Sequence, residues 1–285
     1  MINGLLSRLR RRKDSESTPT ADPPVSPPKK RYRYTVISCI MGGYEPVREV
    51  ANAPSDVRYI LVTDGKGVKS RTWEVRNCDE FPALSKYRSP ISKVNYVRYH
   101  PFEFADTEIS IYIDGSMRIN KSLDKLYDDF SSSSSDIGIG IHPYRANVYE
   151  EISTWISFRG LPREESDSQK RLFGKTYFNR AVLFQSALIL RKNSKVVNVI
   201  DDITWAMLIL TGHGGESARL DQTVLTYVIS TYFSGTRFFL FSQHVMQSSY
   251  ITMYTHGTST PVVVDSRRYI RPSVYGKIIH PYMIE

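Results

Sequence analysis

The sequence has few cysteines and no long apolar run, and both absences limit the classes of protein it can belong to. Its 285 residues include two cysteines, Cys39 and Cys78, which are too few for a disulfide framework and do not form a C-x-x-C pair. No apolar run reaches the roughly 18 residues that span a bilayer. The first 13 residues carry their charges after a short apolar part, the reverse of a signal peptide. We therefore expect a cytoplasmic protein with free thiols.

The common signatures of nucleotide and hydrolase sites are also missing. The sequence contains neither G-x-x-x-x-G-K-[ST] nor G-x-G-x-x-G, which removes the best support for a P-loop or a Rossmann dinucleotide site. It has no H-E-x-x-H zinc motif and no G-x-S-x-G nucleophile motif. Any chemistry must therefore depend on a sparser set of residues.

The positive charge lies mostly in the first 33 residues. Nine Lys or Arg and three Asp or Glu give residues 1–33 a charge of +6, which leaves +3 of the total +9 for the remainder. The nearly balanced charge of the residues after 33 argues against a broad nucleic-acid-binding face. Residues 14–30 contain five prolines and almost no large apolar side chains, so we expect residues 1–33 to be a disordered basic tail. Its first residues form either an amphipathic anchor for an anionic membrane surface or a frayed end.

From residue 34 to residue 285 the pattern predicts a single α/β domain. Short apolar runs alternate with helical patterns, which favours an αβα sandwich with a central, mostly parallel sheet. The expected strands cover residues 34–41, 57–64, 73–77, 108–114, 136–143, 184–192 and 236–243. The expected helices cover residues 89–102, 122–130, 147–160, 194–210 and 220–233. The charged segment 160–175 is expected to be a mobile connection.

Four expected strands end in residues that suit a ligand site. Ligands of open α/β sheets bind beyond the carboxyl ends of the strands. The residues at these four ends are Gly42, Gly43 and Tyr44, then Asp64, then Asp114, Gly115 and Ser116, and finally His142 and Arg145. The two glycines allow close approach of backbone to a ligand, and the tyrosine can stack on a base.

Asp114 has two interpretations at this point. The alternation around Asp114-Gly115 is typical of a hairpin with a type I′ turn. The same carboxylate can instead hold a divalent cation on a diphosphate, with further oxygens and cations nearby. The two interpretations are compatible if the chain turns at Asp114-Gly115 into a short returning strand and this turn presents the Asp114 carboxylate to the ligand.

Three blocks of the sequence resemble one known family. These are residues 93–119, with the strand "ISIYIDG", residues 141–152, reading "IHPYRANVYEEI", and residues 217–229, with "RLDQ". They resemble the glycosyltransferase-like family called domain of unknown function 616, which includes a plant protein described as a ceramidase. The resemblance covers roughly residues 34–235 and implies a GT-A fold, the nucleotide-diphospho-sugar transferase architecture.

The resemblance also implies roles for individual residues. Asp114 is similar to the first acid of the D-x-D signature and would hold Mn²⁺ or Mg²⁺. The position of the second acid is occupied by Ser116 here. Lys93 and Arg145 match basic positions for the donor diphosphate, with His142 and Glu150 in the second block. Asp221 and Gln222 match the "D-Q" pair that faces the sugar, although the extra Leu220 displaces Arg219. The implied catalytic residues are Asp221, Gln222 and Glu150, with Glu151 as a further conceivable base.

The sequence therefore predicts a glycosyltransferase of cell-surface polysaccharide synthesis. It would move a sugar from a nucleotide-diphosphate donor to a hydroxyl of a glycan or glycolipid. One alternative is a sugar-nucleotide or glycan-binding module without turnover, suggested by the missing second acid. Another is a ceramidase-like lipid amidase, which would need metal-ligating His residues at a spacing that the six His do not show.

Overall fold

The structure is a computed structural model and describes residues 31–159, 163–173, 182–212, 220–233, 235–241 and 250–262. Most of the expected N-terminal tail and Arg219 lie outside these residues. Residues from Tyr32 onward form one unit. Arg33, expected to be the last residue of the tail, donates to Asp56 at 2.6 Å and to Asp124 at 2.7 Å. Arg33 therefore contacts two segments of this unit.

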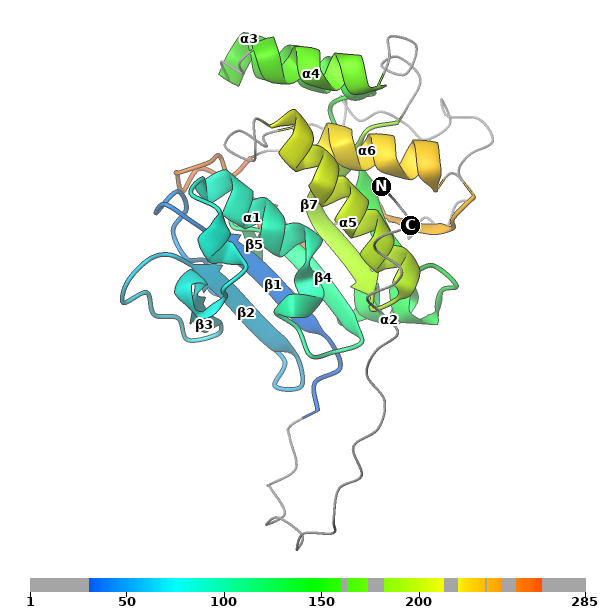
Figure 1. Ribbon diagram of the computed structural model, residues 1–285. Helices are drawn as coiled ribbons and strands as arrows, with labels where there is room; N and C mark the ends of the chain where they lie inside the picture. Colours follow the sequence, from blue (N-terminus) through cyan, green and yellow to red (C-terminus); the bar gives the residue numbers. More distant parts are fainter. Residues whose placement is uncertain are drawn as a thin grey trace, which may run out of the picture. The chain divides into compact units, whose positions relative to one another are not determined.

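The central sheet contains all seven strands that the sequence predicts. They are β1 (Thr35–Ile40), β2 (Arg58–Thr63), β3 (Glu74–Asn77), β4 (Ile109–Asp114), β6 (Ile137–Ile141), β7 (Phe184–Lys192) and β8 (Phe238–Phe241). Their order is β3-β2-β1-β4-β7-β6-β8 (Figure 1). Only β7 runs antiparallel to its neighbours, β4 and β6, while the other pairs are parallel. The mostly parallel sheet is confirmed and is consistent with a GT-A-like fold.

The five expected helices are present, together with one that the sequence analysis missed. They are α1 (Pro90–Tyr99), α2 (Asp124–Ser132), α3 (Val148–Arg159), α5 (Lys195–Thr211) and α6 (Asp221–Tyr232), with short 3₁₀ turns at Cys78–Glu80, Leu84–Lys86 and Pro101–Glu103. The segment expected to be a mobile connection contains α4 (Arg163–Phe173). The helix was missed because, among its described side chains, the buried ones are Ser166, Gln169 and Phe173, and two of these three are polar.

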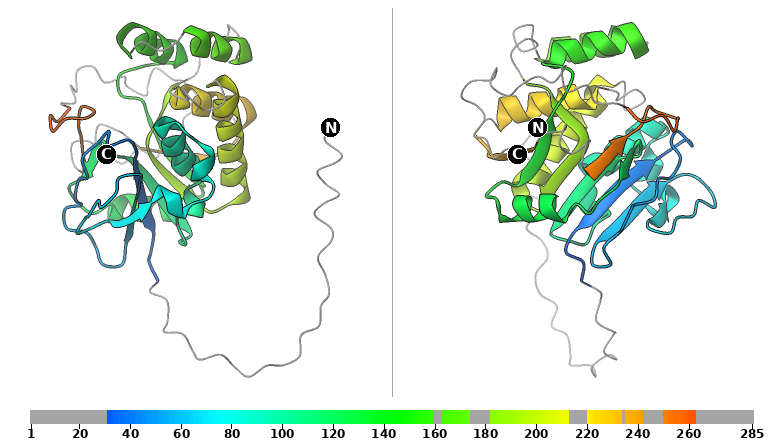
Figure 2. Two further views of the ribbon diagram at one scale, coloured as in Figure 1. Left: turned by 60° about the vertical axis from the view of Figure 1, so that its left-hand side comes forward. Right: turned by 180° about the vertical axis from the view of Figure 1, so that it is seen from behind.

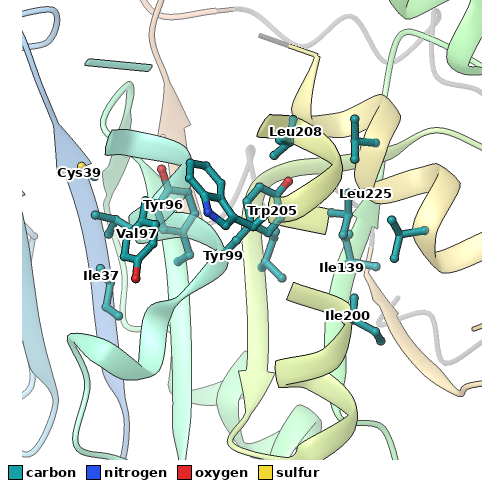
Figure 3. Packing of buried hydrophobic residues seen from close by; sticks show 14 of the residues in the cluster. Ile37, Cys39, Tyr96, Val97, Tyr99, Ile139, Ile200, Trp205, Leu208 and Leu225 are labelled. Atoms are coloured by element: carbon teal, nitrogen blue, oxygen red, sulfur yellow. The ribbon is translucent and has the colours of Figure 1, made fainter. Parts of the chain in front are cut away.

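The two faces of the sheet are covered differently. Helices α1, α5 and α6 cover one face (Figure 1). On this side, Tyr96, Val97 and Tyr99 of α1 pack in one cluster with Trp205 and Leu208 of α5 (Figure 3). Burial of such large apolar side chains is the main force that holds helices on a sheet. Within the described residues no helix is long and apolar enough to cross a membrane.

The second face carries α2 and a small sheet instead of a full helical layer. The small sheet pairs β5 (Met117–Ile119) with β9 (Ile251–Met253) in antiparallel fashion. The view from behind in Figure 2 shows β9 in orange on this face. Met117, Ile119 and Ile251 belong to the same apolar cluster as Phe130 of α2. A segment near the C-terminus therefore completes the core beside the strand that ends at Asp114.

Candidate active site

The fold brings the predicted strand ends to one edge of the sheet. In the register of the parallel strands, Ile40 lies opposite Thr63 and Cys39 lies opposite Asp114. The antiparallel strand β7 begins at the same edge, where Phe184 lies opposite Ile141. The loops that follow β1, β2, β4 and β6 therefore start side by side, as expected for a ligand site in an open α/β sheet.

The loop after β1 is fastened to the end of β2. Both oxygens of Asp64 accept a hydrogen bond from the Gly42 N–H, at 2.8 and 2.9 Å. Gly42 and Gly43 have φ angles of 68° and 61°, a left-handed conformation that favours glycine. The next residue, Tyr44, is 54% exposed. Asp64 thus shapes the loop and presents Tyr44, while the Gly42 N–H is already occupied.

The expected hairpin at Asp114-Gly115 was wrong. The strand after the turn, β5, pairs with β9 and not with β4. A type I′ turn needs positive φ at both central residues, and neither Asp114 nor Gly115 is among the described residues with positive φ. A Cβ on Gly115 would meet Ile40 Cγ1 at 2.7 Å and the Cys39 carbonyl oxygen at 3.1 Å. Glycine is needed here because β1 passes close by.

The Asp114 carboxylate is bound to a buried arginine that sequence reasoning missed. Arg98, on α1, is 6% exposed and donates from Nη2 to Asp114 Oδ1 at 2.5 Å. The hydroxyl of Tyr112 donates to the same oxygen at 3.2 Å. Nη1 of Arg98 donates to Asn95 Oδ1 at 2.7 Å and also to Asp221 Oδ2. One guanidinium therefore joins the two acids that the sequence analysis selected.

Asp221 is held by its Oδ2 atom. Besides Arg98, this oxygen accepts from the Ser186 hydroxyl and, at 3.4 Å, from the Tyr99 hydroxyl. The cap position of α6 is Leu220, which makes no side-chain cap bond. Asp221 is therefore not the simple helix cap that its place in the first turn allows. Ser186 was missed because the register of β6 and β7 is irregular next to Gly140, and β-bulges re-aim side chains.

Gln222 connects this pair of acids to the predicted residues after β6. Its Nε2 donates to Glu151 Oε1 at 3.0 Å, and its Oε1 accepts from the Ser186 N–H at 3.4 Å. Glu151, which is 1% exposed, also accepts from Trp155 Nε1 at 2.8 Å and from Arg145 Nη1. Asp114 and Asp221 thus share one hydrogen-bonded network with Gln222 and Arg145.

His142 is buried and shapes the loop that carries Arg145. Its Nδ1 accepts from the backbone N–H groups of Tyr144, at 3.2 Å, and Arg145, at 3.1 Å. Burial, and then the charge of Arg145, lower the pKa of His142 to about 3. The imidazole is therefore neutral at ordinary pH and acts as an acceptor that orients the loop.

Apart from the loop residues described above, two predicted residues lie outside this network within the described part of the chain. Lys93 Nζ lies 3.8 Å from Cys78 Sγ. Glu150 is exposed, and its carboxylate accepts from the Ala146 N–H at 2.7 Å, next to the start of α3. The basic residue that bonds to Asp114 is Arg98, which was not predicted, and the roles of Lys93 and Glu150 stay predictions.

The residues around Asp114 do not fit a divalent cation held by the protein. Asp114 Oδ2 accepts no hydrogen bond from a described residue, but Ser116, at the place of the second acid, is buried and bonds to Tyr254 through its carbonyl. In the described ranges, no three His, Cys, Asp or Glu side chains gather in a way that could hold a metal. A positively charged guanidinium adjoins the carboxylate. The predicted cation at Asp114 stays a prediction.

Comparisons with known proteins find fold similarity only. No protein-family model matches the chain, and no curated protein matches it. Mouse xyloside xylosyltransferase 1 is 12% identical over 70% of this chain and 82% of its own, with a TM-score of 0.36. The bifunctional glycosyltransferase WbbM is 14% identical over 72% of this chain and 38% of its own, with a TM-score of 0.41. GlyE of Streptococcus pneumoniae is 12% identical over 76% of this chain and 46% of its own, also with a TM-score of 0.41.

This chain thus spans less than half the length of WbbM and GlyE. At such identities the likeness concerns the fold, and the TM-scores are too low to support an argument about donor, acceptor or reaction. The resemblance to domain of unknown function 616 remains an interpretation of the three sequence blocks. A functional proposal has to rest on the residues of the site.

Proposed function

We propose that the protein is a glycosyltransferase that moves a sugar from a nucleotide-diphosphate donor to a hydroxyl of a glycan or glycolipid. The observation that carries the proposal is the network that joins Asp114, Arg98 and Asp221 at the carboxyl edge of a mostly parallel sheet. These acids come from blocks more than 100 residues apart in the sequence. Such convergence of buried charges at a ligand-binding edge is typical of an active site.

Asp221 is the group we assign to the transfer itself. Three buried donors hold its Oδ2, and its Oδ1 accepts no hydrogen bond from a described residue. A carboxylate fixed in this way can orient the donor sugar or accept a proton from the attacking hydroxyl. Gln222 has both ends of its amide engaged, so we assign it to positioning rather than to direct contact.

The donor would lie across the ends of β1, β4 and β6. The side chain of Arg145 is 27% exposed, and it can neutralise charge that develops on the leaving diphosphate. The Tyr44 side chain is 54% exposed and contacts the His256 ring, and we assign it to the base of the donor. We further propose that the reaction serves cell-surface polysaccharide synthesis at the cytoplasmic side of a membrane, with the basic residues 1–33 on its anionic surface.

One observation favours a second candidate, a binding module without turnover. Ser116 replaces the second acid and is buried, so a metal-assisted departure of the diphosphate lacks a ligand. A lipid amidase has less support, because the described residues offer no cluster of metal-ligating side chains for an activated water.

A panel of nucleotide-diphosphate sugars tests these candidates against one another. We expect the purified protein to release a nucleoside diphosphate from at least one donor, and Asp114→Asn to lower that turnover tenfold or more while the protein stays folded. Donor binding without release would support the binding module, and fatty-acid release from ceramide would support the amidase. A folded protein that neither binds nor cleaves any donor of the panel would refute the proposal.

A further inference from the structure

Arg98 lies between two carboxylates in the interior of the protein. Its side chain is 7% exposed, against 23% for Asp114 and 12% for Asp221. Burial opposes the charge on Arg98, but the neighbouring Asp221 and Asp114 charges raise the pKa of its guanidinium well above the ordinary value. The three groups together carry one net negative charge, whereas the two acids alone would carry two.

The donors of Arg98 are almost fully used inside the protein. Nη1 serves Asn95 and Asp221, and Nη2 serves Asp114 and, at 3.4 Å, Tyr112. Nε is buried and has no hydrogen-bond partner among the described residues. A guanidinium engaged in this way has little left to offer a substrate. Arg98 therefore acts through the two carboxylates that it holds.

We infer that Arg98 is a positioning residue whose guanidinium supplies, from within the protein, the positive charge that joins Asp114 and Asp221, so that no divalent cation binds between these two acids. The inference rests on the proposed transferase function and adds the source of the charge. The missing second acid agrees with it, because Ser116 at that position has no carboxylate to offer a cation.

The shape of the guanidinium explains why arginine suits this place. A planar fork can donate to several acceptors in fixed directions, whereas a lysine ammonium is a compact point charge. Here the fork reaches a carboxylate at the end of β4 and another at the start of α6. Each acid is bound through one oxygen, and the other oxygen of each takes no hydrogen bond from the described residues. Arg98 thus fixes the direction of both free oxygens.

The test compares Arg98→Gln and Arg98→Lys with a matched control. The control is Arg191→Lys, because Arg191 is also buried and pairs with Asp201 at 2.8 Å, near the other end of β7. We expect wild-type turnover to be the same, within about twofold, in EDTA and in added Mn²⁺. Folded Arg98→Gln should lose about 100-fold in kcat with little change in KM, and Arg98→Lys should recover part of it. Arg191→Lys should keep its kcat per folded molecule.

Mn²⁺ binding followed by electron paramagnetic resonance gives a readout that does not depend on activity. We expect no Mn²⁺ bound to the wild type alone, and with a nucleoside diphosphate no more bound Mn²⁺ than the nucleotide chelates in the absence of protein. Loss of turnover in EDTA with recovery in Mn²⁺, Mn²⁺ binding that disappears in Asp114→Asn, or near wild-type kcat in folded Arg98→Gln would each overturn the inference. An absence of turnover with every donor would instead refute the proposed function, and the Mn²⁺ titration would still decide the question of the cation.

Discussion

The substitution Asp221→Asn separates a catalytic role from a structural one. The amide keeps the size of the side chain and one oxygen that can accept hydrogen bonds, but it removes the negative charge. In the wild type that charge is shared among Arg98, the Ser186 hydroxyl and, at 3.4 Å, the Tyr99 hydroxyl. Arg98 would keep Asp114 as its counter-charge at 2.5 Å, so no buried cation is left unpaired.

The expected loss of stability follows from these bonds. A hydrogen bond to a charged group contributes about 1.5–3 kcal/mol and one between neutral groups about 0.5–1.5 kcal/mol. Converting the two stronger bonds of Asp221, from Arg98 and Ser186, therefore costs about 2 kcal/mol. For a protein of this size that corresponds to a fall of about 4–8 °C in Tm. Asp221→Ala also leaves a gap and unpaired donors, and should cost about 3–5 kcal/mol.

The effect on turnover should be far larger than the effect on folding. If the free oxygen of Asp221 acts on the donor sugar or the attacking hydroxyl, the amide should lower kcat by 100-fold or more. Stability would be measured by urea unfolding and turnover by nucleoside diphosphate release from the folded variant. Asp201→Asn is the control, because it replaces another buried acid that pairs with an arginine, away from the site. If both variants lose similar stability and both keep near wild-type turnover, Asp221 is only the partner of Arg98.

Three further predictions concern other parts of the chain. Unfolded histidine takes up a proton near pH 6.5 and folded His142 only near pH 3. The unfolded state therefore binds more protons in this window, and the unfolding free energy should fall by about 2 kcal/mol between pH 7 and pH 5. His142→Asn, which keeps an acceptor at the δ position, should lack this loss, and equal pH profiles would contradict the assignment. Gly115→Ala should destabilise the protein by about 1–3 kcal/mol in urea unfolding because its Cβ meets β1 at 2.7 Å, whereas Gly235→Ala, which meets no atom within 4 Å, should be nearly neutral. Deleting residues 1–30 should leave Tm and turnover on a soluble acceptor unchanged and weaken salt-sensitive binding to anionic vesicles; unchanged vesicle binding would remove the anchor.

The edge of the sheet that carries the site could be predicted from the sequence alone. Buried parallel strands are continuous apolar runs, and polar residues directly after them must lie at the same edge. That argument placed Asp64, Asp114 and His142 at one edge, and the register of the strands confirms it. Asp221 could be selected only through the resemblance, because a lone acid in the first turn of a helix has a simpler explanation in the helix dipole.

The partners of these residues could not be predicted, because they depend on contacts between distant segments. The short strand after Asp114 has the alternation of a hairpin, but its partner β9 lies more than 130 residues later in the chain. Ser186 reaches Asp221 only because the pairing of β6 and β7 is irregular at Gly140. Neither feature leaves a trace in the local pattern of apolar residues. Sequence periodicity records which face of an element is buried, and not what it is buried against.

The positions of Lys93 and Arg98 show how helix geometry limits an argument from motif spacing. The two residues are five positions apart on α1, and at about 100° per residue their side chains point about 140° apart around the axis. Only one of them can face the end of β4. Lys93 points toward Cys78, at 3.8 Å, whereas Arg98 lies beside Asp114 and bonds to Asn95, three residues earlier on the same face. The face of α1 that meets the end of β4 therefore determines that Arg98 is the basic residue bound to Asp114, whereas the role of Lys93 at the donor diphosphate stays a prediction.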